Sequence, residues 1–183
     1  MLDQVEIFHG LSREELAALE DSSSSENYPK NTVVIQENEP ADALYVIESG
    51  RVKVYCSDKN GKEFIMNSLG VGDYFGELAL LDDSARSASV RTVEPCQFRI
   101  VKKEDFSKVL TDNPGITQQL LGNLAARVRK LTTDVKNLAL QDVYGRVANV
   151  LMDLSHERGD GTLFVPEKLT QQDIADRVGA SRE

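Results

Sequence analysis

Short segments in which apolar and polar residues alternate fill the middle of this chain, residues 31–101, and turn-forming residues separate them. Alternation with a period of two places successive side chains on opposite faces of a β-strand. In Arg51–Cys56, for example, Val52, Val54 and Cys56 share one face. Many short strands with regular turns are typical of a sandwich or barrel and not of βαβ units. The sequence therefore predicts an all-β middle, and a jelly roll, or β-roll, protects its sheet edges most simply.

Several segments of this middle region are expected to be strands. Gly50 and the pair Asn60-Gly61 supply the turns between the first three of them. The expected strands are Ala43–Ser49, Arg51–Cys56, Glu63–Met66, Ala88–Thr92 and Gln97–Val101. Ahead of them, the polar run Asp21–Glu26 is interpreted as an exposed connection.

Helical patterns lie on both sides of the predicted strands. Ser12 can cap a short N-terminal helix, and Glu15 can complete its capping box. Asn113-Pro114 opens a long helix, because asparagine caps helices and proline suits the first helical position. No terminating pattern follows until beyond Leu138, so we expect one helix over this whole stretch.

The long helix carries one apolar seam. Its members are separated alternately by four and three residues, a spacing that keeps them facing a partner helix. They are Leu124, Val128, Leu131, Val135 and Leu138. A homodimer paired through this helix is the favoured state, and the alternative is a helix that packs only on its own domain.

A second, smaller domain is expected after the long helix. An amphipathic stripe runs from Val143 to Leu154, and glycines near residue 160 interrupt the pattern. Thr170–Val178 has the pattern of a capped helix, and Gly179-Ala180-Ser181 supplies a turn and a cap for another helix. This order indicates a helix-turn-helix motif. We expect an α+β fold with domains at residues 1–112, 113–140 and 141–183.

The cysteines and histidines argue against metal and redox chemistry. Cys56 and Cys96 form no Cys-x-x-Cys motif, so neither a zinc site nor an iron–sulfur cluster is expected. His9 and His156 lie outside the β-rich middle, which leaves a haem without a barrel ligand. A jelly-roll enzyme of the cupin type would need a cluster of histidines inside the barrel, so we do not expect an enzyme.

Charge and hydropathy restrict the partners. The chain has 21 basic and 30 acidic residues, a net charge of −9, so any contact with DNA must be local. No apolar run approaches the roughly 18 residues of a membrane span. The acidic N-terminus lacks the pattern of a signal peptide. These features predict a cytoplasmic protein without a membrane partner.

The region between the third and fourth expected strands carries the clearest chemistry. Gly76 lets the backbone approach a ligand closely, and the amides that open a short apolar turn at Glu77 and Leu78 would point at an anion. Arg86 adds a cationic fork for phosphate oxygens, and Ser87 adds a hydroxyl donor. Glu77 suits a sugar hydroxyl instead. A phosphate site beside a ribose site indicates a nucleotide.

The same residues also have a purely structural interpretation. In it, Arg86 pairs on the surface with Asp82 or Asp83, and the glycines merely turn the chain. The combination of all these residues in one short stretch favours the nucleotide.

The segment Gly72–Glu77, followed by Arg86-Ser87-Ala88, resembles the phosphate-binding cassette of cyclic-nucleotide-binding domains. Similarity extends over nearly the whole chain, through Asp42–Val54, Asn137–Ala139, Asp142–Ala148 and Leu169–Glu183. This order is similar to bacterial transcription regulators of the cyclic-AMP receptor protein (catabolite activator) and FNR family. The resemblance implies a β-roll that binds cyclic AMP, a long dimerisation helix and a C-terminal winged helix-turn-helix domain, incomplete in this chain.

The resemblance also implies roles for individual residues. Gly76, Leu78, Arg86 and Ser87 would hold the cyclic phosphate, and Glu77 would hold the ribose 2′-hydroxyl.

Two residues of the long helix would complete the ligand site. Arg127 matches the family's arginine near the ligand, and Thr132 matches a hydroxyl residue that reaches the adenine in the pocket of the other subunit. Leu131 departs from the pattern, because the cyclic-AMP receptor has a threonine there that bonds adenine from the same subunit. The departure leaves the choice of base open.

For DNA, the resemblance points to the last residues of the chain. Ser181 would meet a phosphate, and Arg182 and Glu183 would read base edges from the start of a recognition helix. Residues 170–183 carry two arginines against three carboxylates, which gives no basic footprint. We expect DNA binding to require residues beyond Glu183, and we expect RNA polymerase as a further partner.

Two other functions stay open at this stage. The same fold could respond to cyclic GMP, to a cyclic dinucleotide or to no effector. Alternatively, the chain could be a regulatory module without a DNA function, since the same cassette serves kinases and channels. The helix-turn-helix pattern argues against the second of these.

Overall fold

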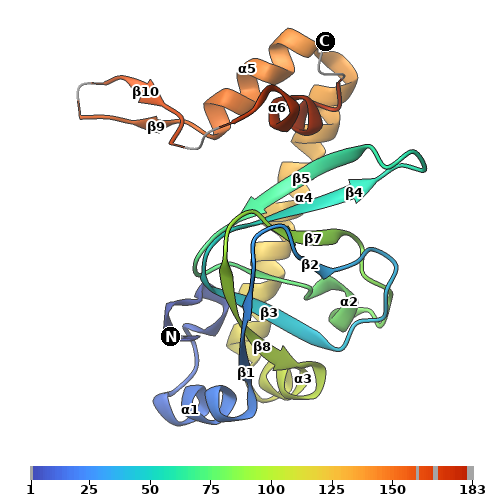
Figure 1. Cartoon of the computed structure of the whole chain (residues 1–183). Coiled ribbons are helices and arrows are strands. Elements are labelled where there is room, and N and C mark those ends of the chain that lie inside the picture. Colours follow the sequence, from blue (N-terminus) through green and yellow to red (C-terminus); the bar gives the residue numbers. More distant parts are fainter. Residues whose placement is uncertain (1, 160, 167–168, 181–183) are drawn as a thin grey trace. The chain divides into compact units, whose positions relative to one another are not determined.

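The computed structural model describes residues 2–159, 161–166 and 169–180 (Figure 1). The chain divides into two compact units, which are Met1–Cys56 with Met66–Leu124, and Ser57–Ile65 with Ala125–Glu183. The expected domain boundaries after residues 112 and 140 stay predictions. Among the described residues, no helix is both long and apolar enough to cross a membrane.

The first sheet has four strands in the order β1-β8-β3-β6. They are β1 (Ser24–Tyr28), β3 (Ala43–Ser49), β6 (Tyr74–Phe75) and β8 (Cys96–Lys102). The short strand β6 pairs with β3, where Tyr45 lies opposite Phe75 and Val46 lies opposite Tyr74. This pairing fixes the start of the segment that carries the candidate site, because Gly76 follows Phe75 directly.

The second sheet has the order β2-β7-β4-β5. Its strands are β2 (Val33–Ile35), β4 (Val52–Ser57), β5 (Glu63–Leu69) and β7 (Ser89–Thr92). Each step along the chain from β1 to β4 changes sheets, as do the steps from β5 to β8, which is the strand order of a jelly roll. The predicted β-roll is therefore confirmed, and the five expected strands lie where the alternation placed them, with small shifts at their ends.

One expectation about the N-terminal region is wrong. The run Asp21–Glu26 is not simply an exposed connection, because β1 begins at Ser24 and pairs with β8. The side chains of Ser24–Asn27 are exposed, so the strand has no buried face to produce an alternating pattern. Backbone hydrogen bonding to β8 holds it in place instead.

Two clusters of buried side chains form the core of the first unit. One fills the space between the sheets and includes Ile47, Phe75, Val90 and Phe98. The other lies on the opposite face of the first sheet. It joins β3 to the helical segments, among them η1 (Leu2–Gln4), η2 (Glu6–Phe8), α1 (Arg13–Ser22), α3 (Lys103–Asp112) and the start of α4 (Pro114–Leu140).

The helix ends agree with the capping signals. Ser12 and Glu15 form the predicted capping box at the start of α1. The long helix α4 begins at Pro114, as expected, and runs for 27 residues. Helix α3 was not among the expected elements. It follows β8 directly and buries Phe106.

The second unit contains α5 (Val143–Asp153), the hairpin of β9 (His156–Glu157) and β10 (Leu163–Phe164), and α6 (Gln171–Val178). Asp142 caps α5 by accepting a hydrogen bond from the amide of Gly145 at 2.8 Å. Thr170 and Asp173 form a capping box on α6, which ends at Gly179 with φ +66°. The capped helix and glycine turn of the expected motif are thus present. The recognition-helix residues 181–183 lie outside the described part of the chain, so the winged helix-turn-helix domain stays a prediction.

Candidate functional site

Gly76 occupies a backbone position that only glycine fills without strain. Its φ is +88°, and an added Cβ would lie 2.5 Å from Nη1 of Arg86 and 3.3 Å from the carbonyl oxygen of Ala43. The sequence predicted a close approach of the backbone to a ligand here. The structure shows that the chain already approaches an arginine side chain at this point.

The short helix α2 (Leu78–Leu81) follows Gly76 at once and confirms the predicted apolar turn. Glu77 is its N-cap residue, and the Glu77 carbonyl accepts from the amide of Leu80 at 3.0 Å. The first N–H groups of such a turn have no acceptor within it. The Glu77 side chain is buried, with the residue 2% exposed, whereas Leu78 is 44% exposed.

Arg86 is buried beside Gly76, with 5% of its surface exposed. Its Nη1 donates to the carbonyl of Gly76 at 2.8 Å, and its Nη2 donates to the carbonyl of Ala43 at 2.9 Å. Nη2 also lies 3.7 Å from a carboxylate oxygen of Asp42. Burial lowers the pKa of Arg86, while Tyr45, Asp42 and Glu77 oppose that shift. An arginine nevertheless keeps its charge in a protein, so the site contains a desolvated cation.

These contacts contradict the structural alternative for Arg86. The guanidinium does not form a surface pair with Asp82 or Asp83. Asp83 instead forms an ion pair with Lys103 at the start of α3, and Asp82 accepts from Ser84. Arg86 therefore points inward, toward the segment that carries Gly76 and Glu77.

The loop between β2 and β3 holds the main chain of Arg86. The amide of Arg86 donates to the carbonyl of Glu39 at 2.9 Å, and the amide of Asn38 donates to the carbonyl of Arg86 at 2.9 Å. Sequence reasoning missed this loop, because it lies more than 40 residues before Arg86 and carries no motif of its own. The two segments meet only through the folding of the sheets.

A cavity of about 270 Å³ borders Arg86. It is lined by Val34, Ile35, Glu39, Pro40, Asp42, Tyr45 and Arg86. Ser87, the next residue, is exposed, and its carbonyl oxygen lies 3.9 Å from the sulfur of Cys56. The structure thus brings Gly76, Glu77, Leu78, Arg86 and Ser87 into one region of the first unit.

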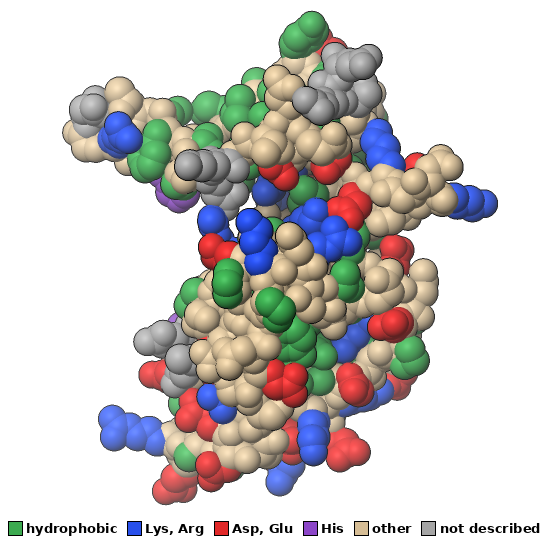
Figure 2. Space-filling model, viewed as in Figure 1, with side chains coloured by type: hydrophobic (Ala, Val, Ile, Leu, Met, Phe, Trp, Pro, Cys, Tyr) green, Lys and Arg blue, Asp and Glu red, His purple; other side chains and the backbone are tan. Residues whose placement is uncertain are grey.

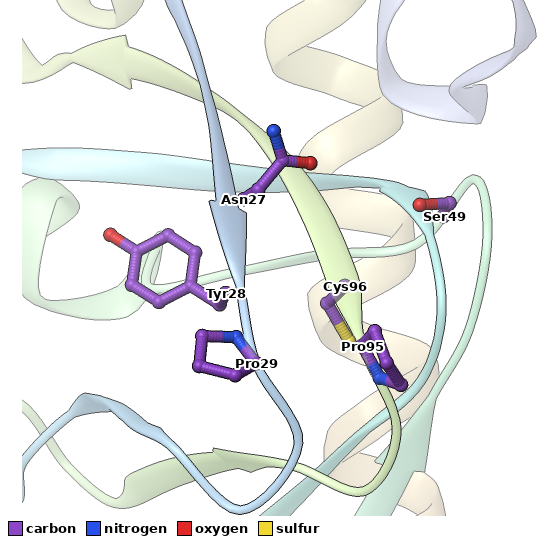
Figure 3. A pocket seen from close by; sticks show the side chains of 6 residues that line it. All are labelled: Asn27, Tyr28, Pro29, Ser49, Pro95 and Cys96. Atoms are coloured by element: carbon purple, nitrogen blue, oxygen red, sulfur yellow. The ribbon is translucent and has the colours of Figure 1, made fainter.

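A second cavity, of about 280 Å³, lies at the end of β1, the end of β3 and the start of β8, as Figure 3 shows. Asn27, Tyr28, Pro29, Ser49, Pro95 and Cys96 line it. None of the predicted site residues is among them. The described residues contain no group of three or more His, Cys, Asp or Glu side chains suited to a metal ion.

Two predicted site residues lie on α4 and belong to the second unit. Arg127 is half-buried, and Thr132 is exposed and donates from its hydroxyl to the carbonyl of Val128 at 2.9 Å. Their participation in one site with Arg86 stays a prediction. Ser181, Arg182 and Glu183, the predicted DNA contacts, lie outside the described residues.

The seam of α4 is largely exposed. Val128 and Val135 are 61% and 64% exposed, and Leu131 and Leu138 are 46% and 42% exposed. Leu124 differs, because it is half-buried and packs against the helical core cluster. Leu121, 61% exposed and seven residues before Val128, extends the seam and was not part of the prediction.

Charges of both signs are mixed over the visible face of the β-roll, as Figure 2 shows. This face is therefore not uniformly basic.

Residues 25–113 match the cyclic nucleotide-binding domain family. The "CRP-like cAMP-activated global transcriptional regulator" of Mycobacterium tuberculosis (strain CDC 1551 / Oshkosh) is 36% identical over 186 residues, which cover 100% of this chain and 83% of that relative. The "cAMP-activated global transcriptional regulator CRP" of Haemophilus influenzae is 37% identical over 162 residues, covering 85% of this chain and 71% of that relative. A solved structure of the c-di-GMP responsive global regulator CLP of Xanthomonas campestris matches with a TM-score of 0.79 at 25% identity, covering 93% of this chain and 86% of the other.

Proposed function

Because this chain belongs to the family of CRP-like transcription regulators, we propose that it is a homodimeric regulator whose response to a cyclic nucleotide controls DNA binding. Cyclic AMP is the proposed effector, since the relatives from Mycobacterium tuberculosis and Haemophilus influenzae are named for activation by it. The observation that carries the proposal is the buried guanidinium of Arg86, held against Gly76 where no side chain fits.

The cyclic phosphate would bind at Arg86. The carbonyls of Gly76 and Ala43 each accept one hydrogen bond from the guanidinium, which keeps further N–H donors for an anion. A charge-assisted contact is strong at a site where the cation is already shielded from water. The opening of α2 adds backbone N–H groups, and Ser87 adds an exposed hydroxyl.

The ribose would bind at Glu77. A carboxylate only accepts hydrogen bonds, so it suits a sugar hydroxyl and repels a phosphate. Because Glu77 follows Gly76 directly, the sugar site and the phosphate site would lie side by side. That pairing selects a nucleotide over inorganic phosphate.

The exposed seam of α4 supports a parallel dimer. Written as a heptad, the a positions are Leu121, Val128 and Val135, and the d positions are Leu124, Leu131 and Leu138. Two of the three a positions are β-branched valines and every d position is leucine, a pattern that favours two parallel strands.

The heptad also suggests how two chains would share one ligand. Arg127 falls at a g position and Thr132 at the following e position. In a parallel coiled coil, g of one helix faces e of the other. Arg127 of one chain would therefore lie near Thr132 of the other, and a ligand that contacts both would bias the seam.

DNA binding would use the second unit. The capping box of α6 and the left-handed turn at Gly179 support this assignment, because they would form the first half of a helix-turn-helix motif. The following residues, Ser181, Arg182 and Glu183, would contact DNA, with RNA polymerase as a further partner. A two-fold dimer would recognise a roughly palindromic site.

A cyclic dinucleotide is the second candidate effector. The regulator CLP, whose structure matches this chain, is described as c-di-GMP responsive. Leu131 cannot donate a hydrogen bond to a base, unlike the threonine that the cyclic-AMP receptor carries there. The identity of the effector therefore has to be decided by comparing the affinities of these ligands directly.

Calorimetric titration with cyclic AMP, cyclic GMP and cyclic di-GMP makes that comparison. We expect the tightest binding for cyclic AMP and its loss in Arg86→Ala. The matched control is Arg13→Ala, which removes an exposed arginine from α1 and should leave the affinity unchanged. If only cyclic di-GMP binds, the proposed effector is cyclic di-GMP and not cyclic AMP. If Arg86→Ala and Arg13→Ala bind the nucleotide equally well, the assignment of Arg86 to the site is refuted.

A further inference from the structure

Tyr45, a residue of β3 that no motif singles out, lies against Arg86. The guanidinium carbon is 5.9 Å from the centroid of the Tyr45 ring. Ala43, two residues earlier on the same strand, supplies the carbonyl that accepts from Nη2 of Arg86 at 2.9 Å. Strand β3 thus presents an aromatic ring and a backbone carbonyl to one guanidinium.

The same tyrosine ring also packs against the segment that leads into Gly76. Tyr45 and Phe75 lie opposite each other in the pairing of β3 and β6, with ring centroids 5.2 Å apart and an angle of 3° between the planes. Phe75 immediately precedes Gly76, whose carbonyl accepts from Nη1 of Arg86 at 2.8 Å. One side chain thus lies against Arg86 and against the residue that precedes Gly76.

The contact between Tyr45 and Phe75 reinforces the pairing of strand β6 with β3. Strand β6 is two residues long and lies at the edge of its sheet, next to β3. Cross-strand aromatic pairs stabilise a sheet locally, which matters most where few backbone hydrogen bonds are made. Phe98 packs edge-on against both rings, so the pair has a fixed place in the core.

We propose that Tyr45 is a positioning residue for the cyclic phosphate, because it holds the guanidinium of Arg86 in register with the backbone of Gly76. This inference rests on the proposed function for its ligand. The ordering of Arg86 by the Tyr45 ring is the geometric part of the inference, and it does not depend on the proposed function. A ring at this place restricts the guanidinium before a ligand arrives, which lowers the entropy lost on binding.

The Tyr45 phenol stays neutral while its ring restricts the Arg86 guanidinium. Burial is the main cause that raises the pKa of Tyr45, and the nearby carboxylate of Asp42 raises it further, although Arg86 opposes the shift. The interaction therefore belongs to the ring face, and Tyr45→Phe preserves it. Tyr45→Leu removes the ring but keeps an apolar side chain, and Tyr45→Met is a second ring-less variant with an adaptable shape.

The first test needs no ligand. Hydrogen exchange of the Arg86 guanidinium is followed by NMR in the full chain, with the signal assigned from Arg86→Lys. We expect slow exchange in the unmodified chain and in Tyr45→Phe, and exchange about fivefold faster in Tyr45→Leu and Tyr45→Met. Unchanged exchange in both ring-less variants would overturn the proposal.

The second test measures affinity for cyclic AMP. Tyr45→Leu should weaken binding about five- to tenfold, and Tyr45→Phe should bind within about twofold of the unmodified chain. In an Arg86→Lys background, Tyr45→Leu should cause no further loss, because its effect passes through the guanidinium. An equal loss in both backgrounds would mean a purely structural role and would refute the proposal. If the unmodified chain binds no cyclic nucleotide, the proposed function fails, and the exchange experiment still decides the role of Tyr45.

Discussion

Gly76 and Arg86 are so close that a Cβ at Gly76 would lie 2.5 Å from Nη1 of Arg86. The contact explains why a glycine must stand at this point of the chain. The backbone also helps to place the guanidinium, because Nη1 donates to the Gly76 carbonyl. A backbone-placed cation is pre-organised for an anionic ligand.

Gly76→Ala should therefore weaken cyclic-nucleotide binding more than tenfold, with a free-energy change of more than about 1.4 kcal/mol. The added methyl group would displace Arg86, and a left-handed φ costs a non-glycine residue about 1–2 kcal/mol. Calorimetric titration measures the affinity, and thermal unfolding measures the fold.

Gly61→Ala is the matched control for this change. Its φ is +78°, but nothing lies within 4 Å of an added Cβ. It carries the backbone strain without the contact on Arg86, so it should lower stability but leave the affinity unchanged. Equal losses of affinity in Gly76→Ala and Gly61→Ala would show that backbone strain alone weakens binding and that the contact with Arg86 does not contribute.

Glu77→Gln should weaken binding of cyclic AMP about tenfold, because a hydrogen bond to a charged group is worth about 1.5–3 kcal/mol. The loss should disappear for 2′-deoxy cyclic AMP, which lacks the hydroxyl that Glu77 is proposed to bind. Titrating both ligands against both proteins isolates that one contact. A similar loss for the deoxy ligand would contradict the role assigned to Glu77.

Val135→Asp should dissociate the proposed dimer. Val135 is 64% exposed in the single chain, and pairing would bury it, so a carboxylate there carries a large desolvation cost. Analytical ultracentrifugation should show a dimer dissociation constant raised at least about tenfold. Thr133→Asp, at an exposed position on the opposite side of the heptad, should stay dimeric. A dimer that survives Val135→Asp would place the interface elsewhere.

Alkaline pH should destabilise the fold partly through Tyr28. Burial, followed by its hydrogen bond to Glu26, raises the pKa of Tyr28 from 10.0 to about 12. Between these values the unfolded state binds fewer protons than the folded state, so stability falls as the pH rises from 10 toward 12. The contribution is fully present below pH 10.

Urea unfolding at pH values of about 9 and about 11 measures this loss. Tyr28→Phe keeps the ring and removes the ionisable hydroxyl, so its stability should fall less between the two pH values. An equal fall in both proteins would assign the alkaline sensitivity to other groups.

Most of the β-roll could be predicted from the sequence, because one face of most strands is buried. In β4, Val52 is fully buried and Lys53 is half-buried, as the alternation predicts. Tyr55, two residues after Lys53, is buried as well, and Val54 and Cys56 are only half-buried, so the contrast holds at the start of the strand alone. In β1 that contrast is missing, and its polar run gave no signal for a strand. Helix α3 was missed because only Phe106 is buried and no side chain caps its start.

The residues of the candidate site likewise divide into those that the sequence could predict and those that it could not. Gly76, Glu77 and Arg86 could be found because they lie within one short stretch whose residue types suit a phosphate and a sugar. Ala43 and Tyr45 could not, because each contacts Arg86 from more than 40 residues away in the sequence. Almost any residue at position 43 would supply the same backbone carbonyl, so the residue type does not indicate that this carbonyl accepts from Arg86.

Hydrogen–deuterium exchange of the full chain, with and without saturating cyclic AMP, tests the central claim most directly. We predict that the nucleotide slows amide exchange in residues 75–88 and in the seam of α4 from Leu124 to Leu138, and that Arg86→Ala abolishes both effects. Protection confined to other segments, or the same protection in Arg86→Ala, would contradict a cyclic-nucleotide site built on Gly76, Glu77 and Arg86.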